Sequence, residues 1–115
     1  DKQAAAIANR LPRLYATEGT PCEEKQLIAK WFSPNTNWTW YAVEGEATEE
    51  GDFEFFGLVI GHETEWGYWR LSDLANAHRN RQGRLILPIE RDLYWTPCAA
   101  REVLKGAQKT LPTQV

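Results

Sequence analysis

The sequence predicts an α+β domain: a four-stranded antiparallel meander sheet with two short helices packed on one face. Eleven of the fourteen aromatic residues fall between Trp31 and Trp69, where they alternate with small, β-branched or charged residues as paired strands require. The helix signals come after this stretch, at Ser72 and at Thr96 followed by Pro97.

Length and composition indicate one domain. The chain has 115 residues, of which 43% are hydrophobic and 25% charged, the balance of an ordinary soluble globular protein. We expect a single domain at residues 11–106, with a flexible tail or short helix at 1–10 and a second tail at 107–115. No apolar run approaches the roughly 20 residues that span a bilayer, and residues 1–10 lack the apolar core of a secretory signal. A cytoplasmic protein without a membrane partner is therefore expected.

The first predicted hairpin joins residues 25–32 to 38–44. Residues 25–32 are compatible with two helical turns or with a strand. We predict a strand because the segment is short for a helix and a turn cluster at 33–37 leads directly to the next strand. Before this hairpin, Pro12 favours an extended chain, and Leu14 and Tyr15 are expected to anchor it to the sheet.

The second half of the meander comprises residues 53–60 and 65–71. It follows a polar, acidic and glycine-containing segment at 45–52, which predicts a mobile loop. Residues 56–60 are apolar on both faces, which predicts a central strand covered on both sides. Gly57 in mid-strand predicts a bulge or a large ring packed over bare backbone.

The C-terminal third is predicted from local signals. Ser72 is expected to cap a helix, with Asp73 in its positive first turn. Residues 85–87 are predicted to form a short strand, and 89–95 an extended or turn-like segment. A last helix is expected at 98–105, ended by Gly106.

The sign of charge is unevenly distributed. Eight acidic residues follow one another without an intervening Lys or Arg, and from Arg70 onward basic residues outnumber acidic ones. The net charge of −3 is too small to predict a nucleic-acid or membrane partner. Two solvated loops explain the pattern, and so does a bipolar surface that docks a charged partner. The acidic residues are Glu44, Glu46, Glu49, Glu50, Asp52, Glu54, Glu63 and Glu65.

The charged triplet Glu90, Arg91 and Asp92 is the most site-like element. One interpretation is structural: Arg91 or Glu90 pairs with a strand charge such as Arg70 or Glu65 and holds the C-terminal segment on the sheet. The other is functional: Glu90 or Asp92 joins Glu44, Glu63 or Glu65 in a carboxylate cluster for acid/base chemistry or a magnesium ion. We favour the structural interpretation.

A second candidate site consists of Trp38, Trp40 and Tyr41, which together suggest a stacking platform for bases. Such platforms normally lie in a positive groove, whereas the strand and loop that follow are acidic. Burial in the core is the favoured interpretation because tryptophans are largely buried.

Catalytic and metal-binding motifs are not found in the sequence. Cys22 and Cys98 lack metal-ligand spacing, and free thiols are expected in a cytoplasmic protein with an adequate core, although the sequence does not decide whether they pair. His62 and Glu63 do not begin an H-E-x-x-H motif, because Trp66 stands where the second histidine is needed. We predict no cofactor and no metal site.

Five blocks of sequence together resemble a bacterial family catalogued only as a domain of unknown function, numbered twenty-nine fifty-eight in that series. The likeness covers about Leu11 to Val103, and Trp69 stands where the family pattern has phenylalanine. The resemblance implies a cytoplasmic accessory protein encoded on plasmids and integrative conjugative elements, and it implies no catalytic residues. The blocks are LPRLYATE at 11–18, WTWY at 38–41, FFGLV at 55–59, GYWRLS at 67–72 and LPIERDLY at 87–94.

We therefore expect a non-enzymatic binding module of a mobile genetic element that engages a host or element-encoded protein, for counter-defence or transfer support. One alternative is a small carboxylate- or metal-dependent enzyme. A second, less favoured one is a binder of single-stranded nucleic acid that uses Trp38, Trp40 and the arginines between 79 and 84. The oligomeric state is left open. The candidate binding residues are Trp38, Trp40, Tyr41, Glu44, Glu65, Arg70, Glu90, Arg91 and Asp92.

Overall fold

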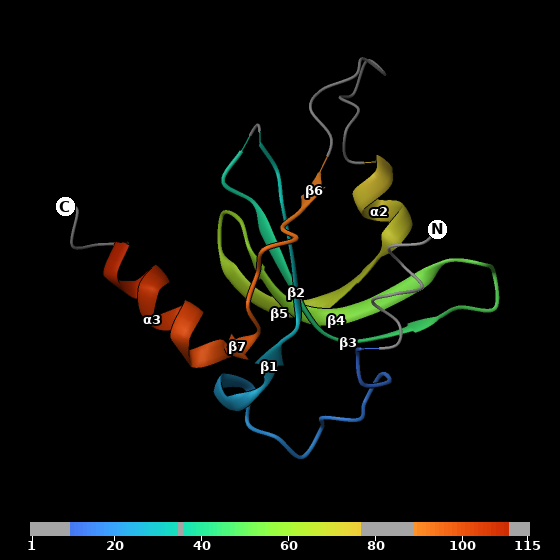
Figure 1. Ribbon diagram of the computed structural model, residues 1–115, viewed down its shortest axis with the longest axis horizontal. Helices are drawn as coiled ribbons and strands as arrows, with labels where there is room; N and C mark the ends of the chain where they lie inside the picture. Colours follow the sequence, from blue (N-terminus) through green and yellow to red (C-terminus); the bar gives the residue numbers. More distant parts are fainter. Residues whose placement is uncertain (1–9, 35, 77–88, 111–115) are drawn as a thin grey trace.

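A long hairpin of β3 (Thr39–Ala47) and β4 (Phe53–Ile60) lies at the centre of the protein (Figure 1). The structure is a computed structural model that describes residues 10–34, 36–76 and 89–110, with side chains described as far as Gly106. The bounds of β4 are those predicted from the sequence. β3 is longer than predicted, because its pairing with β4 continues into the acidic segment as far as Ala47 and Phe53.

The main sheet is antiparallel and has five strands in the order β5-β4-β3-β2-β6. β2 (Ala29–Phe32) and β5 (Thr64–Arg70) flank the hairpin, close to their predicted positions. The antiparallel α+β class is confirmed, but the prediction of four strands is wrong. The fifth strand is β6 (Glu90–Arg91), which pairs with Phe32 and Trp31 of β2 and so satisfies backbone groups on the outer edge of that strand.

A second, two-stranded sheet joins two segments that lie far apart in the sequence. β1 (Gln26–Leu27), which follows the short helix η1 (Cys22–Glu24), pairs with β7 (Cys98–Ala99). The last helix, α3, therefore begins at Ala100 rather than at 98, and it continues past Gly106 to Thr110. Glycine inside a helix costs about 1 kcal/mol relative to alanine, which is too little to end a helix by itself.

The two helices pack on opposite faces of the sheet, and the prediction that they share one face is wrong. Leu74 of α2 (Leu71–Asn76) belongs to a core cluster with Phe55, whereas Ala100 of α3 belongs to a cluster against which Phe56 packs. Successive residues of a strand point to opposite faces, so Phe55 and Phe56 mark the two sides of the sheet. Both faces are apolar and each therefore needs a cover. In Figure 1 the two helices lie on different sides of the molecule.

Gly57 is required by a close approach between strands. A Cβ at this position would lie 1.9 Å from the Tyr41 carbonyl oxygen, beside a register shift in β3 between Ala42 and Glu44. The predicted bulge therefore exists, but it belongs to β3, and Gly57 on β4 makes room for it. Gly67, its partner on β5, has open space at the same position.

The N-terminal segment runs alongside β3 beyond the point where β2 pairs with it. The N–H of Gly45 donates to the carbonyl of Pro12 at 2.9 Å, and Leu11 is buried in the core cluster of Phe55. Leu14 and Tyr15 were expected to anchor this segment to the sheet, and they do so through their backbone N–H groups, which donate to Glu46 and Glu44, while Tyr15 itself is 59% exposed.

Some predictions fall outside the described residues: the tail or helix at 1–10 except for Arg10, the strand at 85–87, and the arginines between 79 and 84. Within the described part of the chain, no helix has the length and apolar character needed to cross a membrane.

Candidate functional site

The bulge in β3 places Glu44 on the same face of the sheet as Phe56 and Tyr68. Glu44 pairs with Phe56 of β4, which in turn pairs with Tyr68 of β5, so the three side chains form a row across three strands. Val43, the residue before Glu44, is buried in the core cluster of this same face. Two successive residues point to one face because the bulge adds a residue to one strand.

Glu44 is a buried carboxylate that is hydrogen-bonded to the N-terminal segment. Only 2% of the surface of Glu44 is exposed to solvent. The N–H of Tyr15 donates to Oε1 at 2.7 Å, and the N–H of Thr17 donates to Oε2 at 2.8 Å. The Thr17 hydroxyl also donates to Oε2. Hydrogen bonds to a charged acceptor are about twice as strong as those between neutral groups, so Glu44 holds this segment firmly.

Tyr15 has a left-handed backbone with φ of 69°. A non-glycine residue in this region is uncommon and costs on the order of 1–3 kcal/mol. The unusual turn lets the N–H groups of Tyr15 and Thr17 converge on one carboxylate, as in the backbone concavities that bind anions. It also directs the Tyr15 ring toward Tyr68, at a centroid distance of 6.2 Å.

Lys25 supplies a buried cation that contacts Thr17, as Glu44 does. Its residue is 5% exposed, and its ammonium donates to the Thr17 carbonyl and, at 3.0 Å, to the Thr17 hydroxyl. The ammonium also lies 5.9 Å from the centroid of the Phe56 ring. Thr17 therefore connects the cation to the anion, and the three residues form one buried network.

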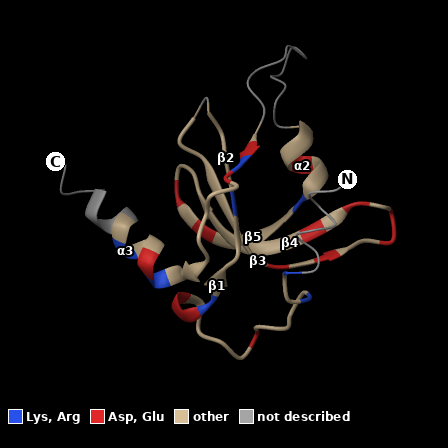
Figure 2. Ribbon diagram, viewed as in Figure 1, with Lys and Arg blue, Asp and Glu red and all other residues tan. Residues whose placement is uncertain are grey.

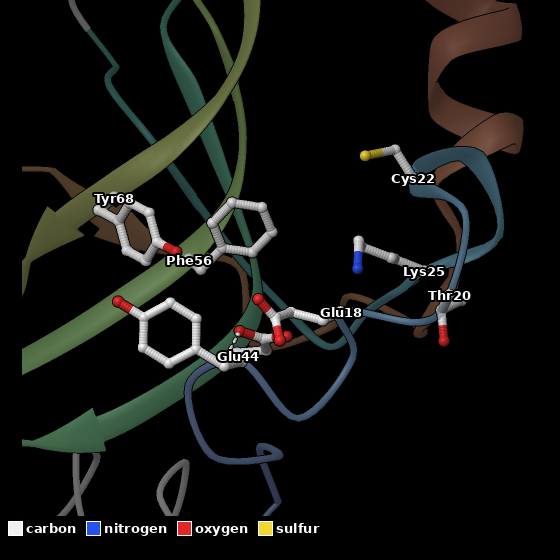
Figure 3. A pocket seen from close by; sticks show the side chains of 8 residues that line it. Glu18, Thr20, Cys22, Lys25, Glu44, Phe56 and Tyr68 are labelled. Carbon is white, nitrogen blue, oxygen red and sulfur yellow. Dashed lines mark hydrogen bonds between the residues drawn. The ribbon is translucent and has the colours of Figure 1, made fainter.

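A pocket of about 240 Å³ opens above this network (Figure 3). Tyr15 and Tyr68 are 59% and 50% exposed, and the Phe56 ring lies 5.0 Å from that of Tyr68. Figure 3 shows the rings of Phe56 and Tyr68 on one side and Lys25 on the other. The lining residues are Tyr15, Glu18, Thr20, Cys22, Lys25, Glu44, Phe56 and Tyr68.

The pKa of Tyr68 is raised above its ordinary value of 10.0. Desolvation is the largest cause, followed by a side-chain hydrogen bond with Tyr15 and by the charges of Tyr15, Glu44 and Glu18. The phenol is therefore protonated at neutral pH and remains a hydrogen-bond donor. The site combines aromatic surface, a hydroxyl donor and carboxylates.

Comparison with known protein families gives a match over nearly the whole chain. A family model with the description "Protein of unknown function (DUF2958)" matches residues 4–107. The chain belongs to the DUF2958 family. The resemblance noted in the sequence is thereby confirmed, and the matched range contains every residue that lines the pocket. No curated protein and no solved structure matches the chain.

The three aromatic candidates of this DUF2958 protein do not form one platform. Tyr41 is 7% exposed and packs 5.2 Å from the Trp95 ring, whereas Trp40 packs against the core cluster on the other face.

Trp38 lies 6.0 Å from Trp40, and its ring would be 2.5 Å from a Cβ added at Gly61. A cavity of about 400 Å³ lies there, lined by Thr36, Asn37, Trp38, Gly61 and His62.

The charged triplet is attached to the sheet by the backbone pairing of Glu90 and Arg91 in β6 and by the side chain of Asp92. The Asp92 carboxylate pairs with Lys30 at 3.7 Å, and the Asp92 N–H donates to the Lys30 carbonyl at 2.9 Å. The buried Nε of Arg91 has no hydrogen-bond partner among the described residues. Burial, followed by the charge of Arg10, lowers the pKa of Arg91. Glu90 is exposed at the edge of the sheet.

The remaining candidates are dispersed. Arg70 pairs with Glu50 at 3.5 Å, and Glu65 is exposed on β5. Of the carboxylates proposed for a cluster, Glu44 alone lines the pocket. In the part of the chain that the structure describes, no three His, Cys, Asp or Glu residues are grouped to hold a metal ion. Cys22 and Cys98 are free thiols.

Sequence reasoning identified only Glu44 of the pocket residues. The others come from three separate segments, namely residues 15–25, β4 and β5, and a register that depends on a bulge brings them together with Glu44. A signal was nevertheless present, because the blocks that carry the family resemblance contain Tyr15, Thr17, Phe56 and Tyr68. These blocks meet in space at the pocket.

Proposed function

We propose that this DUF2958 protein is a non-enzymatic binding module that docks a protein partner at the pocket between Tyr15, Phe56 and Tyr68. The observation that carries the proposal is the half-exposed pair Tyr15 and Tyr68, held over the buried network of Glu44, Thr17 and Lys25. The resemblance to plasmid and conjugative-element proteins supports a role for a mobile genetic element, with a host or element-encoded protein as the partner.

Exposed tyrosines are well suited to protein recognition. Tyrosine presents a large apolar area and a polar tip with few rotatable bonds, and it is enriched among the residues that dominate binding energy at interfaces. Here the Tyr68 ring also contacts Phe56, at 5.0 Å. A partner side chain placed against them would bury aromatic surface on both sides.

The site is ordered before a partner arrives. Glu44 fixes Tyr15 and Thr17 through two backbone hydrogen bonds and one from the Thr17 hydroxyl, and β4 and β5 fix Phe56 and Tyr68 through their pairing. Binding therefore loses little conformational entropy in the protein itself, which favours affinity. A flexible surface loop would lack this advantage.

Site-specific cross-linking tests the proposal. A photo-activated benzoyl-phenylalanine is placed at Tyr15 or Tyr68 in the full chain, and at Tyr94 as the matched control, because Tyr94 is 94% exposed and does not line the pocket. We expect a protein adduct at the two pocket positions that persists after nuclease treatment and is not formed at Tyr94.

The partner is then identified from the adduct and purified as a free protein, and its binding to the chain is measured by calorimetry. Tyr68→Ala should weaken binding about tenfold or more, as expected for a central interface tyrosine, and Tyr94→Ala should not change it. Equal adducts at all three positions, or adducts with nucleic acid alone, would overturn the proposal. The second outcome would favour the nucleic-acid alternative.

A further inference from the structure

We infer that the pocket takes a single arginine side chain of the partner, with its guanidinium packed against the aromatic wall of Tyr15, Tyr68 and Phe56 and facing the carboxylates of Glu18 and Glu44. This inference rests on the proposed function and names the group that the site recognises. Size, wall chemistry and charge each support it.

The size of the pocket suits one side chain. Its volume is about 240 Å³. Sites for small-molecule ligands and cofactors usually have volumes of about 300–1,000 Å³. A pocket below this range that is open to solvent, with two half-exposed rings at its mouth, fits the end of one long side chain better than a cofactor.

The walls suit a planar cation. The Tyr15 and Tyr68 rings are 6.2 Å apart and inclined at 49°, and Phe56 lies beside Tyr68 at 52°. Aromatic faces attract cations, and the flat guanidinium also stacks on them, which an ammonium does not do. The Tyr68 phenol oxygen can accept a hydrogen bond from an N–H at the edge of the same group.

The charges within the pocket favour a cation although Lys25 lines it. The Lys25 ammonium is turned inward to the Thr17 carbonyl and hydroxyl, and only 5% of the residue is exposed. The pocket is lined by two carboxylates, those of Glu18 and Glu44, and by one cation, that of Lys25, so its balance of charge is negative. Oε1 of Glu44 accepts one hydrogen bond from the described residues, that of Tyr15, and so retains capacity for a guanidinium N–H.

The electrostatic field at the mouth of the pocket is negative, as the binding of a cation requires. The charges of Glu44 and Glu18 contribute to the raised pKa of Tyr68, which shows that both carboxylates act at its hydroxyl. The adjoining hairpin has a negative balance of charge (Figure 2), because Arg13 and Arg70 pair with only two of its five acidic residues, Glu46 and Glu50. Such a surface accelerates the approach of a basic partner and sets its orientation. The hairpin acids are Glu46, Glu49, Glu50, Asp52 and Glu54.

A titration with defined peptides tests the inference. The probe is a short Gly/Ser peptide with one central arginine, added to the ¹⁵N-labelled full chain. Its matched controls carry citrulline, which keeps the shape and loses the charge, or lysine. We expect the arginine peptide to shift the NMR signals of Tyr15 and Tyr68 saturably. The dissociation constants of both control peptides should be about fivefold higher or more, as expected for loss of a stacked cation at a partly exposed site.

Variants locate the effect. Glu18 is exposed, so Glu18→Gln should keep the fold, and it should weaken binding of the arginine peptide about two- to fivefold. Glu65 is exposed on β5 outside the pocket, so Glu65→Gln should leave the binding of this peptide unchanged. Tyr68→Ala should abolish the saturable shifts, and Tyr94→Ala should leave them intact.

The result that overturns the inference is equal affinity for the arginine and citrulline peptides, equal affinity for arginine and lysine, or no saturable shift at Tyr15 and Tyr68. The cross-linking experiment is independent of this titration. If the partner adduct still forms at Tyr15 and Tyr68 while the arginine peptide fails, the inference falls and the proposed function stands.

Discussion

Thr17 donates both its backbone N–H and its hydroxyl to the same carboxylate oxygen of Glu44. The hydroxyl of Thr17 in turn accepts a hydrogen bond from the ammonium of Lys25 at 3.0 Å. The segment that carries Tyr15 is thereby attached to β3 through a buried polar network. Since Tyr15 forms one wall of the pocket, the stability of the network and the shape of the site depend on the same contacts.

Replacing Glu44 by glutamine tests this network. The amide keeps the size of the side chain but presents an NH₂ group where two acceptor oxygens now face the N–H groups of Tyr15 and Thr17. One buried donor is then left unsatisfied, which costs about 1–3 kcal/mol. We expect Glu44→Gln to lower the free energy of unfolding by about this amount, as measured by urea denaturation.

The matched control is Glu65→Gln on β5, because Glu65 is exposed. Surface substitutions of this kind usually change stability by less than about 0.5 kcal/mol. If both variants unfold at the same urea concentration as the parent chain, Glu44 does not hold the N-terminal segment.

The strands of the hairpin could be predicted from the sequence because their signal is local. Residues 53–60 keep an apolar pattern from end to end, and the structure gives β4 the same bounds. Cys98 and Ala99 were assigned to a helix because Thr96 and Pro97 form a good local start signal. The structure pairs Cys98 with Leu27, a contact between distant parts of the chain that no local pattern contains.

The site could be predicted only in part for a related reason. Glu44 was identified as one acidic residue among many. Its neighbours Phe56 and Tyr68 are set by a register that shifts by one residue at the bulge, and such a shift moves side chains from one face to the other. The left-handed turn at Tyr15 was equally invisible, because the residue is not glycine.

A pair of glycine substitutions tests the close approach at the bulge. An added Cβ at Gly57 would lie 1.9 Å from the Tyr41 carbonyl oxygen, whereas at Gly67, its cross-strand partner, it would meet open space. The contact at Gly57 is with backbone, which cannot move aside as a side chain does. We expect Gly57→Ala to lower the free energy of unfolding by about 3 kcal/mol or more, and Gly67→Ala to change it by less than about 1 kcal/mol. Thermal and urea unfolding of both variants measure the difference, and equal effects would refute the assigned register.

The contact between Ser72 and Asp52 should make stability depend on pH. The Ser72 hydroxyl donates to Asp52 at 2.5 Å, and this hydrogen bond is the largest cause that lowers the pKa of Asp52 from its ordinary value of 3.8. A carboxyl whose pKa is lower in the folded state stabilises the fold above its unfolded pKa, and this contribution is lost as the pH falls through the folded pKa. We expect Ser72→Ala to be less stable than the parent at pH 7, with the difference shrinking as the pH falls below the ordinary pKa of 3.8 and through the lower pKa of Asp52 in the folded state.

Urea unfolding at a series of pH values measures this difference, and Asp52→Asn provides its control. In the Asp52→Asn background, Ser72→Ala should have an effect that no longer varies between neutral and acid pH. A difference between parent and Ser72→Ala that stays constant over the whole range would show that the contact does not act through the charge of Asp52.

The last prediction concerns the attachment of β6 by Lys30. Its ammonium pairs with Asp92 at 3.7 Å and lies 5.8 and 5.3 Å from the ring centroids of Tyr41 and Trp95. A partly exposed ion pair contributes up to about 1 kcal/mol and each such ring about 0.5–1 kcal/mol. We expect Lys30→Ala to lower the free energy of unfolding by about 1–2 kcal/mol, and Arg101→Ala, which removes an ion pair exposed on both sides, by less than about 0.5 kcal/mol. If Asp92→Asn leaves urea unfolding unchanged but abolishes saturable magnesium or manganese binding, Asp92 is a metal ligand and this structural account fails.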